Sequence, residues 1–141
     1  IITLLLDLQR QLGLTYLFIS HDLTLVHYVS DAMAVLYLGK VVEYGPAGVL
    51  FREPLHPYTA ALLSATLHLD PALRRERILL PGRVPDPAQP PSGCAFHPRC
   101  RHAEQICREQ PPELVLAASG RLVACHLSPK NSPHPEQSAP F

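Results

Sequence analysis

The spacing of apolar residues predicts a helix at the start of the chain, followed by a buried strand. Between residues 1 and 12, apolar side chains recur at steps of three and four, which is typical of an amphipathic helix. Gly13 follows, at the position where glycine commonly ends a helix. Residues 15–19 are a continuous, largely β-branched and aromatic run without alternation, as in a strand covered on both faces. This order indicates an α/β fold with a parallel sheet.

A β-hairpin is predicted next. Residues 32–38 form a second apolar run, the pair Gly39-Lys40 suits a tight turn, and residues 41–44 alternate until a Gly-Pro pair stops the strand. Glu43 lies in the alternating strand, and we expect it to be a solvated or capping residue.

Helices are predicted on both sides of this hairpin. One spans residues 23–29, with Ser20 or Asp22 as its cap. A short helix is expected near residues 47–52, and another from Pro57, which suits a first helical turn, to about residue 67.

The composition changes towards the C-terminus. Twelve of the sixteen prolines and all four cysteines lie from Pro81 onward. Proline lacks a backbone donor, so residues 85–92 are expected to be an extended connection, with a domain boundary near residues 68–81. From Ser128 onward almost no apolar residue remains, and a mobile tail is expected.

Charge and hydropathy exclude two classes of function. Twelve Lys and Arg residues balance twelve Asp and Glu residues, so no strong field attracts nucleic acid or anionic lipid. The apolar runs are shorter than the roughly 20 residues that cross a bilayer, and no membrane insertion is expected. The chain opens directly on a helical pattern at Ile1 without a cap, and we expect it to be truncated at its N-terminus.

His21 is a candidate functional residue because it ends the first predicted strand. Ligands of open α/β sheets bind at the carboxyl ends of strands. The alternative is a capping or packing histidine. Ser20, His21 and Asp22 are adjacent in sequence, so their side chains point in different directions and cannot form a Ser–His–Asp triad. A hydrolase using His21 would also lack a nucleophile at motif spacing.

Several segments resemble a known family. Residues 17–23 (LFISHDL) and 36–45 (LYLGKVVEYG) look like the end of an ABC-transporter ATPase domain. Residues 56–63, which begin His-Pro-Tyr-Thr, and residues 90–100 resemble the oligopeptide and dipeptide importer branch. The resemblance covers about residues 1 to 127.

This resemblance implies the domain organisation. An α/β C-terminal part of a P-loop ABC ATPase domain is expected over residues 1–68, and a Pro-rich linker over residues 69–93. A small, irregular, Cys-rich metal-binding extension is expected over residues 94–127, before a disordered tail over residues 128–141.

The resemblance also implies a role for His21. In this family the strand-end histidine is the switch, or H-loop, residue, so His21 is the implied catalytic and nucleotide-binding side chain. The sequence contains no G-x-x-x-x-G-K-[ST] loop, ABC signature or Asp-Glu strand end, and these are expected to precede Ile1. ATP and Mg²⁺ would then bind only together with that part, and the present chain alone is expected to be inactive.

The cysteines Cys94, Cys100, Cys107 and Cys125 are separated by five, six and seventeen residues. Their residue types allow disulfides, a zinc site or an iron–sulfur cluster. No tight C-x₂₋₄-C knuckle is present, which disfavours zinc, although three nearby histidines keep a mixed site open: His97, His102 and His126. The resembled family carries a [4Fe-4S] cluster at these four positions, with Arg101 as a departure where the family often has proline. A folding role is expected for such a cluster.

The function implied is that of an energy-coupling ATP-binding subunit for import of di- or oligopeptides. Its implied partners are transmembrane permease subunits and a second ATP-binding subunit, at the cytoplasmic face of the membrane. The alternative is a stand-alone metal-binding interaction module without ATPase activity. The sequence does not distinguish peptides from nickel as the transported molecule.

Overall fold

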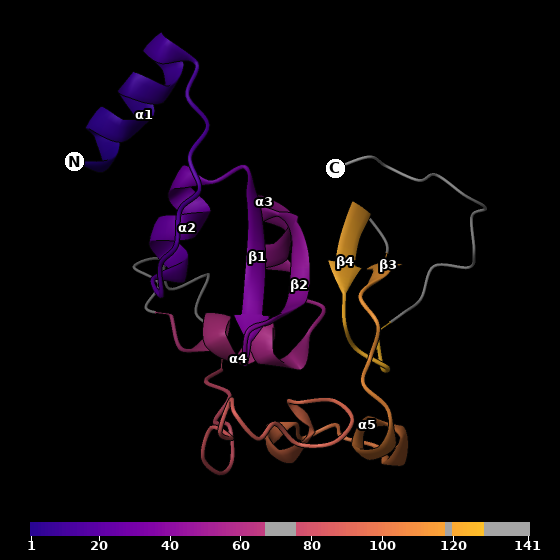
Figure 1. Ribbon diagram of the computed structural model, residues 1–141. Coiled ribbons are helices and arrows are strands. Elements are labelled where there is room, and N and C mark those ends of the chain that lie inside the picture. The colour runs from indigo at the N-terminus through magenta and orange to yellow at the C-terminus, as the bar shows by residue number, and fades with distance from the viewer. Residues whose placement is uncertain (67–75, 118–119, 129–141) are drawn as a thin grey trace.

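The computed structural model describes residues 1–66, 76–117 and 120–128, and it has a mixed α/β fold. Its sheet has four strands in the order β1-β2-β4-β3, and the helices α2, α3 and α4 lie beside the β1–β2 hairpin (Figure 1). The elements are α1 (Ile2–Leu12), α2 (Leu23–Val29), β1 (Ala32–Tyr37), β2 (Lys40–Pro46), α3 (Ala47–Arg52), α4 (Pro57–Ser64), the 3₁₀ turn η2 (His97–Arg99), α5 (Gln105–Glu109), β3 (Val115–Ala117) and β4 (Arg121–Val123).

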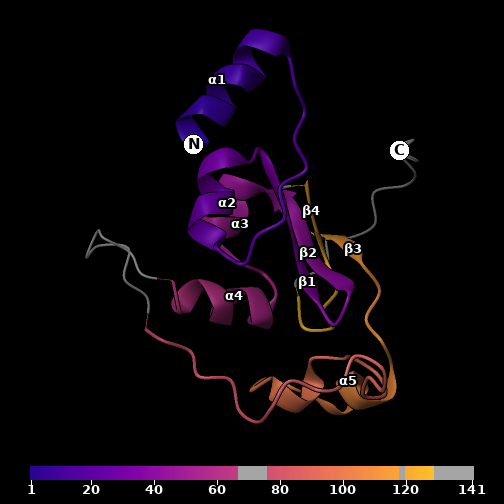
Figure 2. The same cartoon turned by 60° about the vertical axis from the view of Figure 1, so that its left-hand side comes forward.

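The predicted first helix is confirmed. Gly13 caps α1 with a φ of 64°, in the left-handed region that glycine adopts without strain, and donates its N–H to the carbonyl of Gln9. None of the residues of α1 is buried, and the helix stands apart from the sheet (Figure 2). Its apolar face is therefore only partly covered by the described residues.

The predicted strand over residues 15–19 is not formed. Residues 14–20 belong to no helix or strand, and the side chains of Leu17 and Ile19 are 91% and 89% exposed. The expected parallel sheet is also absent, because every strand pairing among the described residues is antiparallel. A strand that is covered on both faces needs neighbouring strands, and none lies beside this segment in the described part of the chain.

The hairpin and the helices around it are confirmed, but β2 runs through the Gly45-Pro46 pair that was expected to stop it. β1 pairs antiparallel with β2, with a bulge between Val35 and Leu36. Asp22, and not Ser20, caps α2, and α3 spans the expected residues. Pro57 begins α4, which ends at Ser64; residue 67, where its predicted end lies, is outside the described residues.

The segment that carries the cysteines is less irregular than expected. It contains α5 and two strands, and β4 continues the sheet by pairing Tyr44 with Leu122 and Glu43 with Val123. The backbone N–H of Ala124 also donates to the carbonyl of Val42 at 2.9 Å. This part of the chain thus completes the sheet begun by the hairpin. The sequence contained no signal for it, because each of the two strands is only three residues long.

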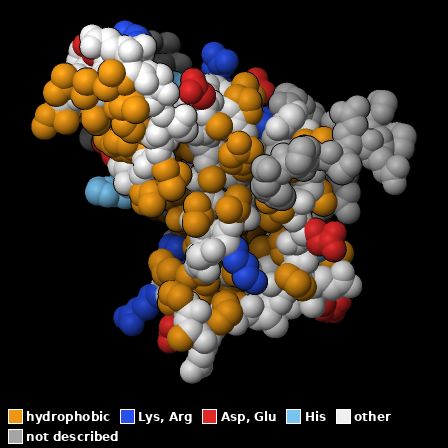
Figure 3. Space-filling view, turned by 45° about the horizontal axis from the view of Figure 1, so that its top comes forward, with side chains coloured by type: hydrophobic (Ala, Val, Ile, Leu, Met, Phe, Trp, Pro, Cys, Tyr) orange, Lys and Arg blue, Asp and Glu red, His pale blue; other side chains and the backbone are white. Residues whose placement is uncertain are grey.

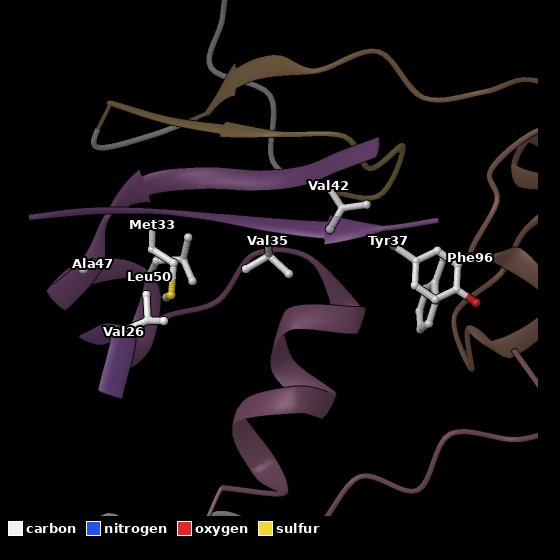
Figure 4. Close-up of a cluster of buried hydrophobic side chains, with 8 residues drawn as sticks. All are labelled: Val26, Met33, Val35, Tyr37, Val42, Ala47, Leu50 and Phe96. Atoms are coloured by element: carbon white, nitrogen blue, oxygen red, sulfur yellow. The ribbon is translucent and has the colours of Figure 1, made fainter. Parts of the chain in front are cut away.

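The core joins the two halves of the chain. Its buried residues are Val26, Met33, Val35, Tyr37, Val42, Ala47, Leu50 and Phe96. Figure 4 shows these side chains along the hairpin, with Tyr37 beside Phe96 at one end. Phe96 lies between two of the cysteines in sequence, is 2% exposed, and packs edge-on to Tyr37 at 5.2 Å between ring centroids. Full burial of such a ring contributes about 1.5–3 kcal/mol, which fixes the cysteine segment against the hairpin.

Two further expectations concern segments that are only partly described. Residues 76–93 contain no helix or strand, whereas residues 69–75 of the expected linker lie outside the described residues. The expected mobile tail over residues 129–141 also lies outside them. Ser128, its first expected residue, is buried. In the ranges described, no helix has the length and apolar character needed to span a membrane.

Candidate functional site

His21 lies at the end of the extended segment 14–20, directly before α2. The backbone around it is held by its neighbours: the N–H of Asp22 donates to the Ser20 hydroxyl at 3.0 Å, and the Asp22 carboxylate accepts from the N–H groups of Thr24 and Leu25. The side chain of His21 is exposed. Asp22 therefore supplies the cap, and the imidazole of His21 is neither a cap nor a core side chain.

An apolar cleft of about 840 Å³ adjoins His21. It is lined by residues of α1, α2, α4, β1 and the segment 15–21, and most of its lining side chains are apolar. Hydrophobic side chains also cover much of the molecular face drawn in Figure 3. Patches of this kind mark surfaces that bind another part of a protein or a partner. His21 is thus an imidazole at the rim of an uncovered apolar surface.

The four cysteines come from three parts of the fold. Cys94 and Cys100 flank the η2 turn, Cys107 lies on α5, and Cys125 follows β4. None of the four is in a disulfide; Cys107 is buried and the others are partly buried. Burial raises the pKa of the Cys94, Cys100 and Cys125 thiols, and negative charge on the other cysteines raises it further. Of these four positions, Cys94 and Cys107 are joined directly, because the N–H of Cys94 donates to the carbonyl of Cys107.

Backbone contacts hold the cysteine segment in place. The N–H of Cys94 donates to the carbonyl of Cys107 at 2.8 Å. Gly93 has a φ of 67°, and a Cβ there would lie 2.5 Å from the carbonyl oxygen of Cys107 and 2.7 Å from the carbonyl carbon of Arg108. Only glycine fits this position, so the loop before Cys94 is pressed directly onto α5.

The histidines near the cysteines are differently placed. His97 Nδ1 lies 3.0 Å from the carbonyl oxygen of Cys94, and His126 Nε2 lies 2.9 Å from that of Gln110. His102 is exposed. Among residues 1–66, 76–117 and 120–128, no group of three or more His, Cys, Asp or Glu side chains is arranged to hold a metal ion. The expected metal centre is therefore not found as a ready-made set of ligands in these ranges.

Glu43 is buried, and the expectation of a solvated side chain is wrong. It is 0% exposed, and its two carboxylate oxygens accept the N–H groups of Leu55 and His56, each at 2.9 Å. It therefore caps the loop before α4, and the alternative expectation of a capping role for Glu43 is confirmed. The alternating pattern of β2 could not show this, because the donors lie 12 and 13 residues further along the chain.

His56 was not singled out as a buried residue by the sequence. It is 2% exposed, and its Nδ1 accepts the N–H of Tyr58 at 3.0 Å, which caps α4. Burial lowers the pKa of His56 to about 4, so the ring is neutral at pH 7 and can act as an acceptor. The His-Pro pair was a usable signal, because a capping side chain followed by proline is typical of a helix start.

Comparison with known proteins finds similarity to one family. Residues 42–107 match the family model described as "Oligopeptide/dipeptide transporter, C-terminal region". This range contains most of the hairpin's second strand, α3, α4 and three of the four cysteines. The resemblance to ATP-binding subunits of oligopeptide and dipeptide ABC importers is confirmed.

Particular relatives extend this similarity over most of the chain. Dipeptide transport ATP-binding protein DppF of Haemophilus influenzae is 52% identical over 125 residues, which are 89% of this chain and 38% of that protein. The probable peptide ABC transporter ATP-binding protein y4tS of Sinorhizobium fredii is 49% identical over 140 residues, 99% of this chain and 40% of that protein. Putative oligopeptide transport ATP-binding protein YkfD of Bacillus subtilis is 52% identical over 129 residues, which are 90% of this chain and 39% of that protein. The chain spans about two fifths of the length of these relatives.

Proposed function

We propose that the chain is the C-terminal part of the ATP-binding subunit of a peptide-importing ABC transporter. The observation that carries this proposal is the similarity over 89–99% of the chain to proteins named as peptide-transport ATP-binding proteins. In the intact subunit, ATP and Mg²⁺ bind to the N-terminal part, and hydrolysis drives import through transmembrane permease subunits. A second ATP-binding subunit completes the pair at the cytoplasmic face of the membrane.

The uncovered apolar surface supports this proposal. Leu17 and Ile19 are almost fully exposed beside the cleft, and Leu4 on α1 is 61% exposed. In the intact subunit, strands of the N-terminal part flank residues 15–19, as the unbroken apolar run of this segment requires. Covering the segment in this way places His21 at the carboxyl end of a strand, where nucleotides bind in open α/β sheets.

His21 then has a defined chemical task. Phosphoryl transfer depends on positioning and on stabilising charge on the transferred group. The exposed imidazole, at the end of a backbone held by Ser20 and Asp22, donates a hydrogen bond toward the γ-phosphate and the attacking water. His21 completes a site whose phosphate loop and magnesium ligands are supplied elsewhere in the subunit.

The test is ATP turnover by the intact subunit. His21→Ala should leave ATP binding largely intact and lower turnover at least about tenfold, which is about 1.4 kcal/mol of barrier. Gln11→Ala, on the exposed side of α1, serves as a control with normal turnover. The 141-residue chain alone should show no ATPase activity above buffer. Near-normal turnover of His21→Ala would exclude the switch role.

We further propose that the four cysteines hold a [4Fe-4S] cluster. The support is the set of four cysteines that are in no disulfide, two of which, Cys94 and Cys107, are joined by a backbone hydrogen bond, while His97 and His126 face backbone carbonyl oxygens. Thiolates are the ligands of such clusters. Cys94, Cys100, Cys107 and Cys125 would hold the cluster, which would cross-link their segments, and the buried Cys107 and Phe96 would keep solvent from it.

Metal analysis distinguishes the alternatives. Protein purified without oxygen should be brown and contain iron and sulfide, because iron–sulfur centres absorb visible light whereas zinc is colourless. Stoichiometric zinc without iron would show that the cysteines form a zinc site and would exclude the cluster. Disulfides without metal would exclude both.

A further inference from the structure

Arg121 is a buried arginine at the junction between the cysteine segment and the hairpin. It begins β4, is 4% exposed, and its guanidinium NH1 donates to the backbone carbonyl of Glu53, 68 residues earlier in the chain. The buried carboxylate of Glu43 lies on the same sheet face, since Glu43 pairs with Val123, two residues beyond Arg121. Arginine is almost never buried this deeply unless its guanidinium is paired.

The strand opposite Arg121 is shaped to admit it. A Cβ at Gly45 would lie only 2.6 Å from the Cγ of Arg121 and 3.3 Å from its Cβ. The φ of Gly45 is not in the left-handed region, so glycine is needed there for space and not for backbone conformation. Gly45 thus lets the arginine stem cross β2 and reach Glu53.

The contact at Glu53 controls the end of α3. Glu53 is the C-cap of α3, and its own N–H donates to the carbonyl of Val49. A cation at this end of a helix satisfies a free carbonyl and complements the helix dipole. The Nε atom of Arg121 is buried and has no hydrogen-bond partner among the described residues, whereas NH1 is bound to the carbonyl of Glu53.

α3 in turn supports the helix that follows His21. The ring of Phe51 on α3 stacks on the ring of His27 on α2, with 4.1 Å between centroids and 11° between planes. The N–H of Ala47, the first residue of α3, also donates to the carbonyl of Asp31 at 2.9 Å. α2 begins at its Asp22 cap, immediately after His21. Packed side chains and rigid helices of this kind are elements through which coupling between two sites can be carried.

We propose that Arg121 is a positioning residue that fixes α3, and through α3 the helix α2 at whose start His21 stands. Docking of the cysteine segment on the hairpin is then required for full ATP turnover, and not only for the stability of that segment. This inference rests on the proposed role of His21. It makes the cysteine segment a part of the ATPase machinery that acts at a distance from the phosphate groups.

The experiment measures ATP binding, KM and kcat of the intact subunit assembled with its permease partners. Arg121→Met keeps the apolar stem and removes the hydrogen bond, and Gly45→Ala displaces an unchanged arginine. Both should lower kcat about fivefold, with KM for ATP changed less than about twofold. Arg121→Lys, which retains a donor, should recover part of the loss. Arg83→Met, at an exposed arginine, is the matched control and should behave as the unmodified protein.

Hydrogen exchange at α2 separates positioning from general destabilisation. The amides of Val26 and Ser30, which donate within α2 and at its end, should exchange faster in Arg121→Met and Gly45→Ala proteins that still bind ATP fully. If either variant is destabilised, its turnover rate is divided by the fraction of the protein that binds ATP. A kcat unchanged in both variants, or unchanged exchange at α2, would overturn the proposal.

The outcomes also separate this inference from the proposed function. Loss of turnover in His21→Ala with normal turnover in both junction variants would leave the switch role intact and exclude the positioning role. Normal turnover in His21→Ala would exclude the switch role itself, and with it positioning through His21. Slow turnover in all three variants with normal ATP binding is the result expected here.

Discussion

Replacing Glu43 tests whether the hairpin and the α4 loop are held together by a buried carboxylate. Its two oxygens accept the N–H groups of Leu55 and His56, both at 2.9 Å, and the side chain is 0% exposed. Glu43→Ala leaves two donors without a partner in a site that water does not reach. Each unsatisfied buried donor costs about 1–3 kcal/mol, so we expect a loss of about 2–6 kcal/mol in the free energy of unfolding.

The assay is urea unfolding of the intact subunit, followed by circular dichroism and by the fluorescence of its tyrosines. Glu43→Gln keeps one acceptor oxygen and should lose about half as much stability as Glu43→Ala. Glu113→Ala removes an exposed carboxylate and should change the unfolding free energy by less than about 0.5 kcal/mol. If Glu43→Ala cost no more than Glu113→Ala, the carboxylate would not be the structural cap described above.

Two further perturbations address the neutral histidine and the cysteines. The pKa of His56 is about 4 in the folded protein and 6.5 when exposed, so the unfolded chain binds more protons between these values. The stability contributed by the neutral ring of His56 is complete above pH 6.5 and is lost as the pH falls toward 4. The free energy of unfolding should therefore fall between pH 7.5 and pH 4.5 by about 2 kcal/mol more in the unmodified protein than in the His56→Asn variant. Asparagine serves as the replacement because it retains a capping acceptor. An equal difference in both proteins would argue against a neutral buried ring. Cys107→Ser should release metal and speed hydrogen exchange over residues 94–126 while the hairpin core stays protected. Unchanged exchange there would exclude a cross-linking role.

The elements that the sequence predicted correctly depend on neighbours in the chain. The helix that ends at Gly13 and the hairpin that turns at Gly39, whose φ is 76°, follow from spacing and turn chemistry within a few residues. The Asp22 cap is equally local. Such local signals predict these elements correctly because they do not depend on residues far away in the chain.

The features that the sequence missed depend on distant partners. Residues 15–19 carry the apolar run of a buried strand but have no neighbouring strand in the described residues. β4 is three residues long, too short for a periodic signal, and pairs with a strand nearly 80 residues earlier. Arg121 looks like a surface residue until Gly45 and Glu53 are placed beside it. The cysteine spacing identified the candidate metal ligands, but it did not show that their segment packs against the hairpin.

The native reading frame upstream of Ile1 bears most directly on the proposal that this chain completes an ABC ATPase. Sequencing that DNA should show an in-frame G-x-x-x-x-G-K-[ST] loop after an apolar strand, then an ABC signature and an apolar strand ending in Asp-Glu. These segments would provide the strands that flank residues 15–19 and the phosphate site that His21 completes. A start codon close to Ile1 with an in-frame stop before it would contradict the proposal, because no phosphate-binding loop would then exist in the protein.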